Sequence, residues 1–197
     1  MNHQSRTFFT RCASALFLAG LSGTAAAHTL GPDGAGLAEG LAHPFLGLDH
    51  LLAMVGVGLW AAQLGGPARW QLPLAFLMVM AGGAWLGQAG QDLAGAEIMI
   101  ALSVVALGVL VALSARMAGW LGVGLVSLFA LFHGYAHGQE LPQAAAPLTY
   151  AAGFLLATLM LHLIGLGLGL SVSRLQAASR VSGLAMASTG VYLLASL

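Results

Sequence analysis

The chain has 197 residues, of which 59% are hydrophobic and only 6% are charged, and its formal net charge is zero. An ordinary soluble domain carries about 25% charged residues, and the few charges of this chain cannot cover a water-exposed surface. The composition excludes an ordinary soluble domain and indicates an integral membrane protein, and it offers no basic patch for nucleic acid.

Residues 1–27 are predicted to be a secretory signal peptide. Two arginines precede a short apolar stretch, and three alanines ending at Ala27 form a typical cleavage pattern. The alternative is an uncleaved first membrane helix. Cleavage would remove Cys12, the only cysteine, which leaves no thiolate for a metal site. It would also make His28 the N-terminal residue. Its amine and imidazole can then chelate a metal, or the residue has no role in metal binding.

Residues 28–42 are rich in Gly and Pro, which predicts a short linker. Six apolar stretches follow, each near the ~20 residues needed to cross ~30 Å of hydrocarbon. Backbone groups in lipid must be satisfied within the segment, so each stretch is expected to be a helix. The predicted fold is therefore all-α, a polytopic six-helix transmembrane domain over 28–197, with spans at 44–64, 70–88, 93–114, 117–136, 147–171 and 179–197.

The charge pattern predicts the orientation of these spans. If the signal peptide is cleaved, the N-terminus lies outside and the short loops alternate between the two sides. All four remaining arginines then fall at inside loops, as the positive-inside rule requires: Arg69, Arg116, Arg174 and Arg180. Both mature termini are then expected on the outer side of the membrane.

A first polar motif stands at the outer end of the first span. It contains His43, Asp49 and His50, followed by an apolar run. Two histidines seven residues apart share a helical face but lie ~10 Å apart along a straight axis, too far to bind one ion together. Pro44 suits a first helical turn, so His43 can act as a cap that folds back. Met54, one turn below His50, is either a packing residue or a soft thioether ligand.

A second polar motif stands at the outer end of the fourth span. His133 and His137 are spaced i and i+4, and Glu140 follows within one turn, which places three possible ligands on one stripe. Each histidine alone would be read as a hydrogen-bonded core residue. Two compact clusters on the same side of the membrane instead predict a shared metal site, and imidazole with carboxylate suits nickel, cobalt, zinc or divalent iron.

Further polar residues are secondary candidates. His162, near the middle of the fifth span, is either a relay or second station for an ion or a helix–helix hydrogen-bonding group. Glu97 is either a mouth residue or, more simply, a helix-end carboxylate. Four tryptophans near predicted helix ends suit an interfacial belt: Trp60, Trp70, Trp85 and Trp120.

The segments HPFLGLDHLLAM and FHGYAHGQE resemble the two polar motifs of the HupE/UreJ family of bacterial membrane proteins. The resemblance covers the whole mature chain. It implies nickel uptake for hydrogenase and urease maturation, with cobalt in some members. It also implies a location in the bacterial inner membrane, with both mature termini in the periplasm, and passage of the metal from periplasm to cytoplasm. By this resemblance the matching site residues are His43, Asp49, His50, His133, His137 and Glu140.

The predicted function is therefore a divalent-metal permease for nickel or cobalt, and not an enzyme. The metal is its substrate and the bilayer its surroundings, no separate cofactor is expected, and assembly into a homo-oligomer is left open. Two alternatives stand beside it. Histidines and carboxylates could activate a water in an intramembrane metal-dependent enzyme, or the chain could be a metal-binding accessory subunit.

Overall fold

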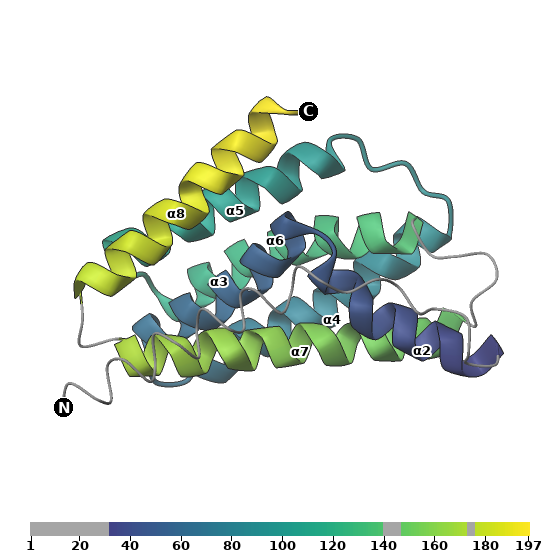
Figure 1. Cartoon of the computed structure of the whole chain (residues 1–197), viewed down its shortest axis with the longest axis horizontal. Helices are drawn as coiled ribbons and strands as arrows, with labels where there is room; N and C mark the ends of the chain where they lie inside the picture. The colour runs from purple at the N-terminus through teal and green to yellow at the C-terminus, as the bar shows by residue number, and fades with distance from the viewer. Residues whose placement is uncertain (1–31, 140–146, 173–175) are drawn as a thin grey trace. The chain divides into compact units, whose positions relative to one another are not determined.

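The computed structural model describes residues 32–139, 147–172 and 176–197, and every regular element in these ranges is helical (Figure 1). The prediction of an all-α fold is confirmed. The predicted signal peptide, His28 and Glu140 lie outside the described residues. The elements are α2 (Pro32–Ala42), the 3-10 turn η1 (His43–Phe45), α3 (Leu48–Leu64), α4 (Ala68–Gln88), α5 (Ala96–Leu113), α6 (Gly119–Gln139), α7 (Pro147–Val172) and α8 (Gln176–Ala195).

Four helices in the described ranges are long and apolar enough to cross a membrane: α4, α5, α6 and α7. A fifth span results if the bent pair Gly36–Phe45 and Leu48–Leu64 is counted as one. The last helix, α8, is long enough but is not one of these spans. Its sequence is less apolar, since it contains Ser179, Arg180, Ser182 and Thr189.

The predicted linker over 28–42 is wrong from Pro32 onward, because this stretch forms α2. Pro32 stands at the first helical position, where its missing N–H costs nothing. The glycines serve close packing instead of breaking the helix. A methyl group at Gly40 of α2 would overlap the Tyr150 carbonyl of α7, and one at Gly153 of α7 would overlap the Leu37 carbonyl of α2.

The predicted first span, 44–64, is not one helix. The turn η1 contains Pro44, and the chain then passes through Leu46 and Gly47 before α3 begins at Leu48. The axis bends by 79° at this break. Gly47 has an extended backbone, with φ −103° and ψ 124°, which ends the preceding turn and starts α3 in a new direction. The bend lies inside the first polar motif, so it decides how that motif is shaped.

Glycines also set the direction in which helices pair. A methyl group at Gly134 of α6 would overlap the Met80 carbonyl of α4, and one at Gly138 would overlap that of Ala84. The contacts advance in the same direction along both helices, so α4 and α6 run parallel. Small residues allow such close approach of backbones in membrane proteins.

The pair α3 and α7 runs parallel for the same reason (Figure 1). Met54 of α3 meets Thr158 of α7, Gly58 faces the His162 carbonyl too closely for a Cβ, and Ala62 meets Gly169, so the contacts advance together along both helices. The third close pair, α5 with α8, runs antiparallel, since Gly183 meets Ala112 and Gly190 meets Val105.

The tryptophans divide into two groups. Trp70, Trp85 and Trp120 are exposed, as an interfacial belt requires. The prediction is wrong for Trp60, which is fully buried and donates its indole Nε1–H to the Ala115 carbonyl at 3.0 Å. Trp60 therefore fastens the end of α3 to the connection between α5 and α6.

Candidate metal centre

The histidines of the two polar motifs meet at one end of the helices. The ring centroid of His50 lies 4.2 Å from that of His137 and 4.9 Å from that of His133. The ring of His43 lies 4.7 Å from that of His137. We call these four residues the histidine cluster. They come from η1, α3 and α6, and the parallel pairing of α3 with α7 and of α4 with α6 holds these helix ends together.

The bend before α3 brings His43 into the cluster. On a straight helix His43 and His50 would be separated by ~10 Å along the axis. Their ring centroids instead lie 6.4 Å apart, because η1 turns back over the start of α3. Pro44, buried in η1, stiffens this turn by fixing its own φ.

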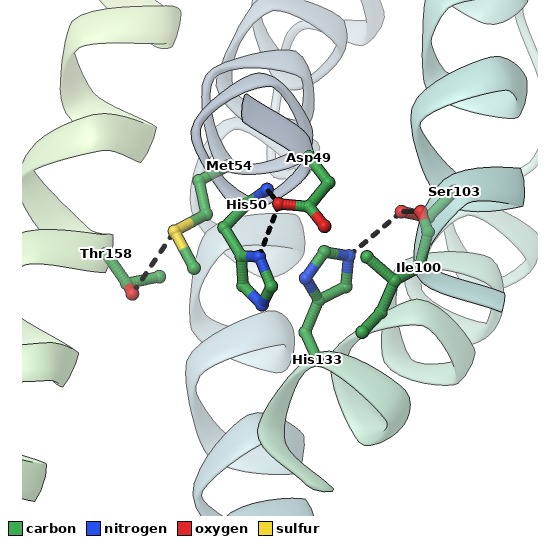
Figure 2. Close-up of polar contacts among 7 residues, drawn as sticks. All are labelled: Asp49, His50, Met54, Ile100, Ser103, His133 and Thr158. Carbon is green, nitrogen blue, oxygen red and sulfur yellow. Dashed lines mark hydrogen bonds and ion pairs between the residues drawn. The ribbon is translucent and has the colours of Figure 1, made fainter. Parts of the chain in front are cut away.

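Asp49 holds the imidazole of His50 in one orientation (Figure 2). Nδ1 of His50 lies 2.7 Å from Asp49 Oδ1, and the backbone N–H of His50 donates to the same oxygen at 2.7 Å. An ionised carboxylate only accepts hydrogen bonds, so Nδ1 carries the proton and Nε2 keeps its lone pair. Carboxylates orient metal-binding histidines in this way in many proteins. Gly47 leaves room for the arrangement, since a Cβ there would lie 2.6 Å from Asp49 Oδ1.

Ser103 of α5 orients the imidazole of His133, as Asp49 orients that of His50. Its hydroxyl donates to the Ile100 carbonyl at 2.6 Å, and its oxygen lies 2.9 Å from His133 Nε2 (Figure 2). A hydroxyl has a single proton. With that proton on Ile100, Ser103 accepts from His133 Nε2–H, which leaves the lone pair on Nδ1. Figure 2 shows this Nδ1 on the side of the ring that faces His50.

The nitrogens left over are buried and have no partner within the described part of the chain. They are Nε2 of His50, Nδ1 of His133 and both ring nitrogens of His137. These side chains are almost fully enclosed, with residue exposures of 9%, 0% and 1%. Buried polar groups are nearly always hydrogen-bonded, because burial without a partner costs about 1–3 kcal/mol. Each neutral imidazole keeps one nitrogen lone pair, so three neighbouring rings offer the kind of donor that a cation needs.

The rings are close enough to share an ion but are not yet turned toward it. With a metal–nitrogen bond of ~2 Å, the centroids of two imidazoles on one ion lie up to about 6 Å apart. The observed separations from His50 fall inside this range. Within the described residues, however, no three His, Cys, Asp or Glu side chains are arranged to hold an ion as they stand. Ion binding therefore requires the rings to rotate.

Aromatic side chains of α7 and α4 line the histidine cluster. The Phe154 ring packs on His137 with centroids 3.9 Å apart, and the Phe76 ring lies 5.8 Å from that of His133. Both phenylalanines are buried. The surroundings are therefore apolar, and electrostatic interactions inside such a site are stronger than in water.

The secondary candidates are spread along the helices. Met54 is fully buried below His50, and its sulfur accepts a hydrogen bond from Thr158 at 3.4 Å. His162 is fully buried on α7, away from the cluster, with its ring 5.1 Å from that of Phe76. Glu97 is exposed in the first turn of α5, where a carboxylate suits the helix N-terminus. Sequence reasoning missed Ser103, although a lone serine in an apolar span was a usable signal.

Comparison with known proteins agrees with the two motifs. The family model described as HupE / UreJ protein matches residues 16–193. The chain is 45% identical to Protein HupE of Rhizobium leguminosarum bv. viciae over 188 residues, which cover 94% of this chain and 98% of the relative. No solved structure matches. The helical membrane fold, the paired histidine motifs and this similarity together show that the chain belongs to the HupE/UreJ family, which is associated with nickel and cobalt transport.

Proposed function

We propose that the protein is a permease that carries Ni²⁺ or Co²⁺ from the periplasm to the cytoplasm. The observation that carries this proposal is the meeting of His50, His133 and His137 with bare, buried ring nitrogens. Imidazole nitrogen is a preferred ligand for nickel, copper, zinc and iron. His43 from η1 adds a fourth ring, and Glu140 and His28, outside the described residues, are proposed as further oxygen and nitrogen ligands.

The proposed direction rests on the arginines. Arg69 stands at the start of α4, Arg116 between α5 and α6, and Arg180 near the start of α8. These are the helix ends away from the histidine cluster. Because cytoplasmic loops are enriched in Lys and Arg, the arginine end faces the cytoplasm and the cluster faces the periplasm. This orientation includes α8 as a sixth span, a cleaved signal peptide over 1–27, and inner-membrane placement with both mature termini in the periplasm.

The chemistry needed at the cluster is partial replacement of the ion's water shell. Neutral imidazoles supply nitrogen lone pairs, while Asp49 and Ser103 keep His50 and His133 in the protonation forms that leave those lone pairs bare. Asp49 also places a negative charge beside the site, which offsets part of the cost of moving a divalent cation into apolar surroundings.

Two other functions would use the same cluster: an intramembrane metal-dependent enzyme and a metal-binding accessory subunit. An enzyme would need a second group to act as general base on a metal-bound water. Among the described residues, the carboxylate beside the cluster is that of Asp49, and it is already engaged twice by His50. This favours a binding and transport role over hydrolysis.

The test is uptake by the purified protein in liposomes. Ni²⁺, Co²⁺ and Zn²⁺ accumulation is measured with and without a pH gradient, against empty liposomes. Saturable uptake of Ni²⁺ or Co²⁺ by the protein alone is the expected result. Tight binding without uptake would overturn the permease proposal in favour of the enzyme or the accessory subunit, and restoration of uptake by a membrane extract would select the latter.

A further inference from the structure

A further buried histidine, His162, lies deeper between the helices than the histidine cluster. His162 is fully buried on α7, and neither ring nitrogen makes a well-aligned hydrogen bond among the described residues, although the backbone carbonyl of Thr158, one turn earlier, lies beside the ring. An imidazole in this state inside a membrane helix is expensive, and such residues usually mark a path for an ion or a proton. The cost needs an explanation that packing alone does not supply.

The depth of His162 follows from its neighbour on α3. Its backbone carbonyl faces Gly58, which lies about 12 Å along α3 from His50 at ~1.5 Å per residue. That depth is well inside a hydrocarbon core of ~30 Å. A divalent ion that leaves the cluster would meet His162 part of the way across.

Polar atoms and one aromatic ring link the two levels. Thr158 stands one turn before His162 on the same face of α7, and its hydroxyl donates to the sulfur of Met54 (Figure 2). Met54 in turn stands one turn below His50 on α3. Phe76 contacts both imidazoles, with its ring 5.8 Å from that of His133 and 5.1 Å from that of His162. All of these side chains except that of His50 are fully buried.

We propose that His162, with the thioether of Met54 beside the path, is a second metal-binding station that receives the ion from the histidine cluster, and that Phe76 separates the two positions. As a transport step this rests on the proposed permease function. The ligands fit the cargo, because imidazole nitrogen binds Ni²⁺ and Co²⁺ and the softer thioether binds weakly enough to release. A crossing ion needs such a station, since charge in the membrane interior is costly without partners.

The first test separates binding from transport. In His162→Leu and His162→Gln proteins, Ni²⁺ affinity of the cluster should stay within about threefold of wild type, because Asp49, Ser103 and the cluster rings are untouched. Uptake into liposomes should fall at least tenfold. Wild-type uptake by both variants would overturn the proposal. Loss of Ni²⁺ binding by both would also overturn it, since His162 would then support the cluster and not a separate station.

The second test does not depend on transport. His162→Cys is made with Cys12→Ser, so that the new thiol is the only one in the chain. Addition of Co²⁺ should produce a thiolate-to-cobalt charge-transfer band. The matched control is Leu163→Cys in the same background, because this neighbouring side chain is exposed. A band in the control, or none at position 162, overturns the station. If wild-type protein fails to transport but the band appears at position 162 alone, the permease proposal fails and the site stands.

Discussion

His50 and His137 lie with their ring centroids 4.2 Å apart, at an angle of 62°, although one belongs to the first polar motif and the other to the second. His50 offers Nε2, and His137 has both ring nitrogens bare. The two residues sit at the start of α3 and near the end of α6. Their contact joins the two motifs into one candidate site.

Replacing His137 by Ala should abolish high-affinity Ni²⁺ binding and uptake. His137 contacts both His43 and His50, so its loss removes the ring that connects them. Since partners of metal ligands alone contribute 10–100-fold, loss of a ligand should weaken affinity by on the order of 100-fold or more. Isothermal titration with Ni²⁺ measures this. Tyr192→Ala, which removes an exposed ring on α8, is the control and should bind normally. Normal Ni²⁺ accumulation by His137→Ala would remove the ligand assignment.

Asp49→Asn should weaken Ni²⁺ binding by about 10–100-fold while leaving the metal's nitrogen ligands in place. The amide oxygen still accepts from His50 Nδ1–H, but the negative charge that orients and polarises the ring is gone. X-ray absorption of the Ni²⁺-loaded protein should show the same number of imidazole ligands as wild type. Loss of an imidazole ligand would show that the amide cannot orient His50, which contradicts the prediction. An unchanged Ni²⁺ affinity would show that the charge of Asp49 is unimportant.

Most of the fold could be predicted from hydropathy, because a span must satisfy its backbone internally and must be long enough to cross. The limits of α4 to α7 follow the apolar runs closely. Two features could not be predicted this way. The glycines before Ala42 predict a linker, whereas they serve the close packing of α2 on α7. The bend at Gly47 is set by one extended residue, which leaves no trace in hydropathy.

The residues that gather in the cluster could be predicted from the alternation of spans, which places both motifs at one end. Their connections could not. The spacing of Asp49 and His50 leaves open which one orients the other, and only the 2.7 Å contact shows that Asp49 holds His50. Ser103 comes to the cluster from α5 through tertiary packing. As the lone serine of an apolar span it stands out in the sequence, but no motif connects it to His133. The position of Trp60 near a helix end predicts an interfacial residue, because sequence position alone does not reveal its burial.

Ser103→Ala should lower Ni²⁺ affinity about tenfold with little change in helix content. The buried His133 Nε2–H would lose its acceptor, at a cost of about 1–3 kcal/mol, and the ring would be free to change its tautomer. The matched control is Ser182→Ala on α8, whose hydroxyl also bonds a carbonyl three residues earlier but touches no histidine in the described contacts. Equal effects of the two changes on Ni²⁺ titrations would exclude a specific role for Ser103.

Acidic pH should weaken Ni²⁺ binding and uptake reversibly. The ion binds neutral imidazole, so each proton taken up by a cluster nitrogen competes directly with the metal. Affinity should therefore fall as pH decreases and recover when the pH is restored. Titrations across a series of buffers, with circular dichroism at each pH to confirm that the helices persist, measure the effect. Affinity that does not change with pH would argue that imidazoles are not the ligands.

Gly134→Ala should destabilise the protein and weaken metal binding at once. The new methyl would overlap the Met80 carbonyl, so α4 and α6 must separate, and such overpacking typically costs about 1–3 kcal/mol. His133 precedes this glycine on α6, so the cluster moves with the helix.

Gly124→Ala on the same helix is the control, because a Cβ there meets nothing within 4 Å. Replacing a helical glycine by alanine at an open position is favourable by about 0.5–1 kcal/mol, so the control should be as stable as wild type or more so. Thermal unfolding in detergent, followed by Ni²⁺ titration, gives both readouts. A Gly134→Ala protein as stable as Gly124→Ala would show that α4 and α6 do not pack as closely as this contact requires.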